Sequence, residues 1–162
     1  MSDAINIRST TTADGGRMWA LVRESDALEL NTSYCYLLMA KHFSATCLVA
    51  ERGDELLGFV MAYRPPDQPD TAFVWQIGVA AAARGQGIAG RLLDALADTS
   101  GARYIEASVG ETNAASQALF NGFARRREAN VDSDADFINA AEFPGEHETE
   151  KRFRIGPLAT AA

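Results

Sequence analysis

Residues 71–98 place a long apolar segment, a glycine-containing turn and an amphipathic segment in direct succession. The first part, TAFVWQIGV (71–79), predicts a central strand because it is rich in β-branched and aromatic residues. The last part, GQGIAGRLLDALAD (85–98), predicts a helix with one apolar face, formed by Ile88, Leu92, Leu93 and Leu96. A glycine-rich turn before a helix is a typical anion-binding site, because the first backbone N–H groups of the helix point toward the turn.

Strands and helices are also expected on both sides of this unit. Further strands are predicted at residues 5–9, 46–51, 56–63, 103–109 and 151–156. Helices are predicted from a cap at Thr12 or Asp14 to Arg23, from a cap within 31–33 through Lys41, and from Asn113 to about Phe123. The acidic stretch 128–150 predicts a loop. The order of elements predicts one α/β (or α+β) domain over residues 1–162, with helices flanking a mixed central sheet.

Composition narrows the functions that this chain can have. The net charge of -7 argues against a general nucleic-acid role, because such proteins usually carry a basic surface. Cys35 and Cys47 are too few for a disulfide framework or a zinc site, so we expect buried thiols and no metal. The N-terminal residues lack a signal-peptide core, and no apolar run approaches the roughly 20 residues of a membrane span. We therefore expect a cytoplasmic protein without a membrane partner.

The glycine-containing turn fits two different phosphate-binding patterns. Gly85, Gly87 and Gly90 match the dinucleotide pattern G-x-G-x-x-G, and Glu106 follows near the spacing of its ribose-binding acid. In that motif, however, the glycines begin at the end of the strand, whereas here AAAAR separates them from Val79. The second pattern, R-x-x-G-x-A over residues 84–89, does not require that adjacency and is favoured. A glycine-rich helix start that binds no ligand is the structural alternative.

Two motifs in order resemble the GNAT acyltransferase superfamily. VWQIGVAAAARGQGIAGRLLDAL contains its [QR]-x-x-G-x-[GA] pattern, and the next predicted strand is followed by ETNAASQALF. The resemblance implies that acetyl-CoA is the acyl donor and that two parallel strands, 72–79 and 103–109, splay apart around its pantetheine arm. It implies these cofactor-binding residues: Ile77, Val79, Arg84, Gly85, Gln86, Gly87, Ile88, Ala89, Asn113 and Ser116.

A narrower resemblance covers about residues 5–157. LELNTSYCYLLMAKHFSATCLVAE, PPDQPDTAFVWQIGV and PGEHETEKRFRIGP together resemble the L-2,4-diaminobutyrate acetyltransferases of ectoine biosynthesis. The resemblance implies a cytoplasmic homodimer that makes N4-acetyl-L-2,4-diaminobutyrate, an ectoine precursor in osmoprotection. An N-acetyltransferase for another small amine or a peptide N-terminus is the alternative within the superfamily, and a noncatalytic acetyl-CoA-binding module is the alternative outside catalysis.

A small cationic amino acid requires anions for its two amines and a polar group for its carboxylate. Glu29, Asn31 and Tyr34 precede or begin the second predicted helix and are candidates for this role, although Tyr34 could instead pack in the core. Trp75 lies on the predicted central strand, where an indole face can cover an ammonium group. A core tryptophan is the alternative. His147 and Glu148 are further substrate-binding candidates on the resemblance to the family.

Glu150 is the candidate general base, directly or through one water. Its position matches the acid of the family's H-E-x-E pattern, and burial beside apolar groups raises the pKa of a carboxyl. His147 is the alternative base, because the unperturbed pKa of histidine already suits proton removal. Phe120 stands where many GNAT enzymes have a tyrosine that protonates the departing thiolate. Water or Tyr34 would have to supply that proton here, or the thiolate leaves as such.

Overall fold

The structure, a computed structural model, describes residues 3–159. Within this range the chain forms four α-helices and a seven-stranded mixed sheet in the order β1-β2-β3-β4-β5-β7-β6. The strands are β1 (Asn6–Ser9), β2 (Cys47–Arg52), β3 (Glu55–Tyr63), β4 (Thr71–Val79), β5 (Tyr104–Gly110), β6 (Val131–Ile138) and β7 (Glu150–Ile155). The helices are α1 (Thr12–Arg23), α2 (Ser33–His42), α3 (Ile88–Ser100) and α4 (Ala114–Arg126), with short 3-10 turns η1 (Ala81–Ala83) and η2 (Ala140–Glu142). The predicted α/β class with a mixed sheet is confirmed.

The chain forms two compact units. Unit 1 contains the residues up to Tyr63 together with Trp75–Ser100, and unit 2 contains Arg64–Val74 together with the residues from Gly101 onward. The chain changes unit within β4, so each unit is built from two separate stretches of sequence. The single domain expected over residues 1–162 stays a prediction. Within residues 3–159, no helix is both long enough and apolar enough to cross a bilayer.

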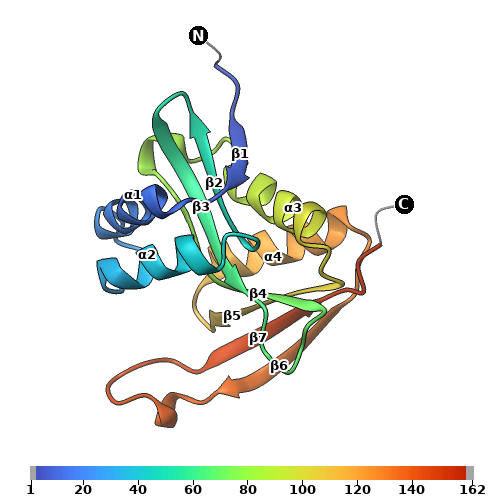
Figure 1. Cartoon of the computed structure of the whole chain (residues 1–162). Coiled ribbons are helices and arrows are strands. Elements are labelled where there is room, and N and C mark those ends of the chain that lie inside the picture. The colour runs from blue at the N-terminus through green and yellow to red at the C-terminus, as the bar shows by residue number, and fades with distance from the viewer. Residues whose placement is uncertain (1–2, 160–162) are drawn as a thin grey trace. The chain divides into compact units, whose positions relative to one another are not determined.

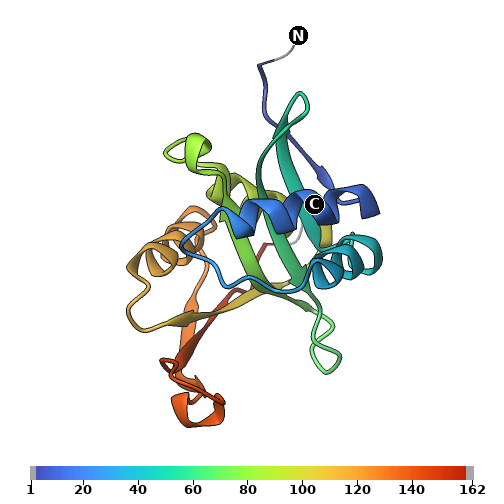
Figure 2. The same cartoon turned by 90° about the vertical axis from the view of Figure 1, so that its left-hand side faces the viewer.

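Unit 1 is a layered structure around β1, β2 and β3. These strands pair antiparallel, with a bulge between Ala50 and Glu51. Helices α1 and α2 cover one face and α3 covers the other, as Figure 1 and the turned view in Figure 2 show. The predicted apolar face of α3 is confirmed, because its four apolar residues are fully or almost fully buried: Ile88, Leu92, Leu93 and Leu96. The core beneath α1 and α2 contains Met18, Val22, Tyr36, Phe59 and Met61.

The start of α1 is fixed by a buried carboxylate. Asp14 is 1% exposed and accepts hydrogen bonds from the Thr11 backbone N–H (2.7 Å), Arg8 Nη1 (2.8 Å) and Arg17 Nη1 (3.0 Å). Both arginines also bind Glu51 on β2. Burial opposes ionisation of Asp14, but the hydrogen bonds from Arg8 and Thr11 outweigh it, so the pKa of Asp14 is lowered. The ion-pair cluster therefore ties α1 to β1 and β2.

Unit 2 contains the parallel part of the sheet. The first four residues of β4 pair with β5 from Thr71–Tyr104 to Val74–Ala107, although β4 itself continues to Val79. This short ladder agrees with the predicted pair of parallel strands that separate. β7 pairs antiparallel with β5 and also with β6, which lies beside it in Figure 1.

Three expectations about the elements were wrong. Stretch 128–150 is not all loop, because β6 pairs with β7 and Asp132 binds Arg152 at 3.2 Å. The acidic residues therefore lie on a strand, β6, that is almost fully exposed. Because this strand lies at the edge of the sheet and faces solvent, its side chains need not be apolar. The third helix begins at Ile88 rather than at residue 85, because the glycines before it have positive φ. The cap of α1 is Thr11, one residue before the predicted Thr12.

Candidate functional site

The loop between β4 and α3 is an exposed backbone cradle. Gly85 and Gly87 have φ values of 82° and 71°, in the left-handed region that glycine adopts without strain. Residues 84–87 are exposed, and Arg91 N–H donates to the Gly87 carbonyl at 3.0 Å, which marks the first turn of α3. The first N–H groups of a helix have no partner within the helix, so they face the loop and favour an anion there. The arrangement fits a pyrophosphate at residues 84–89.

The side chain of Gln86 has a contact that the sequence did not indicate. Its Oε1 accepts a hydrogen bond from Arg52 Nη2 at 3.1 Å, so the β2–β3 turn supports the loop from outside. The predicted contacts of Gln86, Ile88 and Ala89 with a cofactor stay predictions. Ile88 is 2% exposed and serves the core through its side chain, so only its backbone N–H is suited to a phosphate.

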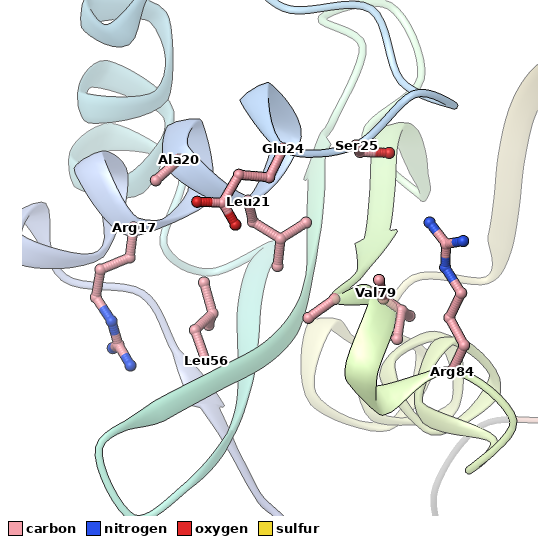
Figure 3. A pocket seen from close by; sticks show the side chains of 10 residues that line it. Arg17, Ala20, Leu21, Glu24, Ser25, Leu56, Val79 and Arg84 are labelled. Atoms are coloured by element: carbon pink, nitrogen blue, oxygen red, sulfur yellow. The ribbon is translucent and has the colours of Figure 1, made fainter.

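A cavity of about 420 Å³ lies beside the end of β4 in unit 1. Figure 3 shows its side chains: Leu21 extends from α1 and Glu24 from the C-cap directly after it, while Val79 and Arg84 come from the end of β4 and the turn after it. Arg17 and Leu56 also line it. Val79 and Arg84, two predicted cofactor-binding residues, therefore share one cavity whose lining combines apolar side chains with charges of both signs.

The alternation predicted for β4 is confirmed. Val74, Gln76 and Gly78 are buried, whereas Trp75 is 44% exposed and Ile77 is partly exposed. Trp75 is therefore not a core tryptophan. Its predicted contact with a substrate ammonium stays a prediction, which an accessible indole permits.

The segment before α2 is fixed by two buried polar side chains. Gln76 Nε2 donates to the backbone carbonyl of Glu29 at 2.6 Å, and Gln76 Oε1 accepts from the Tyr36 hydroxyl at 2.8 Å. The Tyr36 hydroxyl also accepts from Asn31 N–H at 3.4 Å. These bonds use the backbone of the segment, so the exposed Glu29 carboxylate and the Asn31 amide are left for a ligand. Neither Tyr36 nor Gln76 was among the residues predicted for the site.

Tyr34 points away from the core. It is 66% exposed in the first turn of α2, so the alternative that it packs inside is wrong. The helix itself begins as expected: Thr32 is its N-cap, and the Thr32 hydroxyl accepts from Cys35 N–H at 3.2 Å. The predicted substrate contact of Tyr34 stays a prediction.

In unit 2, Asn113 caps α4. Its Oδ1 accepts a hydrogen bond from the Ser116 backbone N–H at 3.1 Å. The cap orients the N-terminal end of α4, which carries a partial positive charge. The predicted cofactor contacts of Asn113 and Ser116 therefore rest on a defined helix start, and they stay predictions. Phe120 is 3% exposed inside unit 2 and carries no ionisable group.

The segment before β7 is held at three points. The His147 ring stacks on Phe143 with centroids 3.7 Å apart, and its Nδ1 donates to the Glu148 carbonyl at 2.6 Å. Glu148 Oε2 accepts from the backbone N–H (3.2 Å) and the hydroxyl (3.0 Å) of Thr112. The carboxylate of Glu148 is thus joined to the turn that precedes α4, a contact the sequence did not indicate.

Glu150 is the first residue of β7 and pairs with Gly110 on β5. The residue is partly buried, and its Oε2 is shielded from solvent. A carboxylate at such a place can act on a ligand while water is largely excluded from one of its oxygens. The proposed role of Glu150 as general base stays a prediction.

Glu106 has a structural role that excludes ribose binding. It is 2% exposed and forms an ion pair with Arg154, which also donates to Gln68 (3.0 Å) and Thr71 (3.1 Å). The Arg154 guanidinium lies over the Tyr104 ring. Glu106 therefore cannot serve as the ribose-binding acid that the dinucleotide interpretation requires.

Cys35 and Cys47 both lie within residues 3–159. No group of three or more His, Cys, Asp or Glu side chains in this range could hold a metal ion. Cys47 is fully buried, and burial raises the pKa of its thiol to about 11. Cys35 is only partly buried, contrary to expectation, and burial raises its pKa as well.

Known proteins resemble this chain in sequence and in structure. Residues 17–123 match the family described as the acetyltransferase (GNAT) family. The L-2,4-diaminobutyric acid acetyltransferase of Marinococcus halophilus is 46% identical over 159 residues, 96% of this chain and 92% of that protein. The protein of the same name from Streptomyces coelicolor is 41% identical over 160 residues, which cover 96% of this chain and 94% of that protein.

Solved structures give the same result. The diaminobutyrate acetyltransferase EctA from Paenibacillus lautus, in complex with its substrate L-2,4-diaminobutyric acid and coenzyme A, superposes with a TM-score of 0.91 at 37% identity and covers 99% of both chains. The protein yncA from Salmonella typhimurium, solved with its cofactor acetyl-CoA, shares the fold alone. Its TM-score is 0.72 at 18% identity, and the match covers 98% of this chain and 97% of that chain. The chain belongs to the GNAT acetyltransferase family and, within it, to the L-2,4-diaminobutyric acid acetyltransferases.

Proposed function

We propose that this protein transfers the acetyl group of acetyl-CoA to the 4-amino group of L-2,4-diaminobutyrate. The product is N4-acetyl-L-2,4-diaminobutyrate, which we assign to ectoine biosynthesis. One observation carries the proposal: similarity to the diaminobutyrate acetyltransferases extends over 96% of the chain at 46% identity, far beyond the phosphate loop. A full-length match includes the segments proposed to contact the acceptor as well as those proposed to contact the donor.

The donor is held mainly by backbone groups. The N–H groups at the start of α3 and the positive-φ glycines suit the pyrophosphate, and Arg84 adds a charge from the cavity side. The backbone of Ile77 and Val79 at the end of β4 pairs with the pantetheine arm. Asn113 and Ser116 at the capped start of α4 contact the same arm.

The acceptor is held by side chains. The exposed carboxylate of Glu29 binds one ammonium group, and the amide of Asn31 with the hydroxyl of Tyr34 binds the carboxylate. The indole of Trp75 covers the second ammonium group, whose approach the negative net charge of the chain assists. The resemblance to the family assigns His147 and Glu148 to the amino acid as well, and Glu148 would act from its anchored position on Thr112.

The reaction is a direct transfer without a covalent enzyme intermediate. Glu150 removes a proton from the 4-ammonium group, and the free amine attacks the thioester carbonyl. The backbone N–H near Val79 stabilises the negative oxygen. The C–S bond then breaks, the C–N bond remains, and the nitrogen releases its second proton to water. Phe120 cannot donate a proton, so the thiolate takes one from Tyr34 or from water.

Two measurements test the function. An NMR spectrum of the product from diaminobutyrate and acetyl-CoA is expected to show the acetyl group on N4, and an acetyl group on N2 would overturn the regiochemistry. Thiol release is expected to be at least tenfold slower with ornithine, lysine and spermidine. Comparable rates would favour a general amine acetyltransferase, and binding of acetyl-CoA without turnover of any amine would favour a noncatalytic module.

The resemblance also predicts a homodimer in the cytoplasm. Light scattering of the purified chain is expected to give twice the chain mass of 17.4 kDa. Fractionation of the cells that produce it is expected to recover the protein with the cytoplasmic enzymes.

A further inference from the structure

Tyr36 and Gln76 form a buried polar pair inside unit 1. Tyr36 is completely buried and Gln76 is 7% exposed, so neither hydroxyl nor amide can obtain a full set of partners from water. Burial of such groups is unfavourable unless each forms hydrogen bonds within the protein. Hydrocarbon side chains of the same size would fill this space without that requirement. The pair therefore has a purpose other than packing.

Apart from each other, the hydrogen-bond partners of Tyr36 and Gln76 both lie in one segment of the chain. The amide of Gln76 donates to the Glu29 carbonyl, and the Tyr36 hydroxyl links Gln76 to the backbone N–H of Asn31. Between them, the two side chains hold a five-residue segment, 28–32, that has no helix or strand of its own. A segment without internal backbone pairing is positioned only by what binds it.

A steric contact acts on the same segment. A Cβ atom added to Gly78, two residues after Gln76 on the same side of β4, would lie 2.8 Å from Leu28 Cδ1. Because Gly78 has no side chain, the Leu28 side chain can pack directly against β4 at this position. β4 thus positions segment 28–32 in two ways: Gln76 donates a hydrogen bond to it, and Gly78 leaves room for Leu28. The alternate residues Trp75 and Ile77 point to the opposite face of β4.

We propose that Tyr36 and Gln76 are positioning residues that fix segment 28–32 for the amine substrate, and thereby set the affinity for the amine but not for acetyl-CoA. The inference rests on the proposed function, in which Glu29 and Asn31 of this segment bind the amino acid. The pair touches neither substrate. It holds the backbone, so that the Glu29 carboxylate and Asn31 amide project from fixed positions.

The test uses Gln76→Met, which keeps the side-chain volume and removes both hydrogen bonds. We expect the KM for diaminobutyrate to rise roughly tenfold, because two buried hydrogen bonds that order the segment are lost. The KM for acetyl-CoA is expected to change less than about twofold. Tyr36→Phe removes only the hydroxyl and is expected to give a smaller rise of the same kind, and it serves if the first variant fails to fold.

Thr46→Val is the matched control. The Thr46 hydroxyl is also buried in unit 1 and donates to the Ala62 carbonyl at 2.6 Å, but it does not touch segment 28–32. We expect a comparable loss of Tm with both KM values unchanged. A proportional rise of both KM values in Gln76→Met, or a KM for diaminobutyrate equal to that of the wild type, would overturn the proposal.

Hydrogen exchange separates this proposal from the proposed function. Without substrates, the amides of residues 28–32 are expected to exchange at least tenfold faster in Gln76→Met and at the wild-type rate in Thr46→Val. Unchanged exchange in Gln76→Met refutes the positioning role, even if the enzyme acetylates diaminobutyrate. Faster exchange in a protein whose wild type acetylates no diamine supports the fixation of the segment and refutes the assigned substrate.

Discussion

The phosphate loop and segment 28–32 are both irregular stretches of unit 1, but they are made in opposite ways. The loop owes its form to its own residues: Gly85 and Gly87 take positive φ values and α3 begins directly afterwards. Segment 28–32 owes its position to Tyr36 and Gln76, and Gln76 lies 47 residues from the Glu29 carbonyl that it binds. A site built from local backbone can be recognised in a sequence, whereas one held by distant side chains requires the fold.

This difference predicts separable kinetic effects. Substitutions in the phosphate loop are expected to weaken the binding of acetyl-CoA alone, because the geometry of the loop depends on few other residues. Substitutions of side chains proposed to contact the acceptor are expected to alter the binding or deprotonation of the amine. The affinity for acetyl-CoA is expected to stay unchanged. The following variants test that separation.

Glu150→Gln is expected to have the largest effect, because it removes the proposed base while keeping the size of the side chain. We expect kcat to fall by about 100-fold or more, with the KM for acetyl-CoA unchanged. Glu146→Gln, at an exposed position nearby, is the control and is expected to behave as the wild type. Retained turnover in Glu150→Gln would assign the base to His147, whose variant His147→Gln would then carry the loss.

Asp14→Asn tests whether a loss of stability alone can mimic either effect. It removes a buried charge from between Arg8 and Arg17 and is expected to lower the free energy of unfolding by about 3 kcal/mol. Below the unfolding temperature both KM values are expected to stay within about twofold. A selective change in one KM would show that the two regions are less separate than the structure indicates.

The pH dependence of stability follows from the same carboxylate. The native pKa of Asp14 is lowered, so its stabilising contribution is present above the pKa of the unfolded chain and is lost as the pH falls through the native pKa. The pKa of Glu51 is also lowered, through its hydrogen bonds from Arg8 first, and adds to the trend. Acid denaturation followed by circular dichroism is expected to show a free energy of unfolding that falls in the wild type as the pH drops through the native pKa of Asp14, and a weaker dependence on pH in Asp14→Asn.

Gly87→Ala tests the donor side. A side chain at a φ of 71° costs about 1–2 kcal/mol, so the KM for acetyl-CoA is expected to rise roughly tenfold. The KM for diaminobutyrate is expected to remain unchanged. Gly53→Ala is the matched control: its φ is 57° and its Cβ would also meet open space, but it lies in the β2–β3 turn. Equal kinetic effects of the two alanines would contradict a role for Gly87 in binding the donor.

Trp75→Leu is expected to have the smallest effect. Loss of a partly exposed cation–π contact costs about 0.5–1 kcal/mol, so the KM for diaminobutyrate is expected to rise about threefold. Trp19→Leu removes an indole from α1 that lies under Arg23 and serves as the control. A rise in the KM for acetyl-CoA in Trp75→Leu would place Trp75 on the donor side.

Most of the fold could be predicted because its elements have strong local patterns. β4 has the bounds 71–79 that its apolar alternation predicts, and the α3 face from Ile88 to Leu96 is buried as expected. β6 could not be predicted, because its side chains are almost all exposed and its acidic residues are typical of loops. Its strand character comes from pairing with β7, which no local pattern reports.

In the candidate site, too, features that depend on local sequence could be predicted, whereas features that depend on distant residues could not. The glycine-containing turn before α3 and the cap Asn113 lie where their local motifs predict them. The contacts of Tyr36 with Gln76 and of Glu148 with Thr112 join residues 40 and 36 positions apart. A buried glutamine on an otherwise apolar face of β4 is the one sequence signal that could have revealed the first pair.

The burial of Cys47 has a consequence for following the reaction. Aromatic disulfide reagents react with thiolates, and a thiol with a pKa of about 11 is almost entirely protonated at neutral pH. Released CoA is a small, freely accessible thiol, so it is expected to develop colour quickly while Cys47 stays silent. Each equivalent of dye then counts one acetyl group transferred, and concentrated enzyme can be used without correcting for a background from that cysteine.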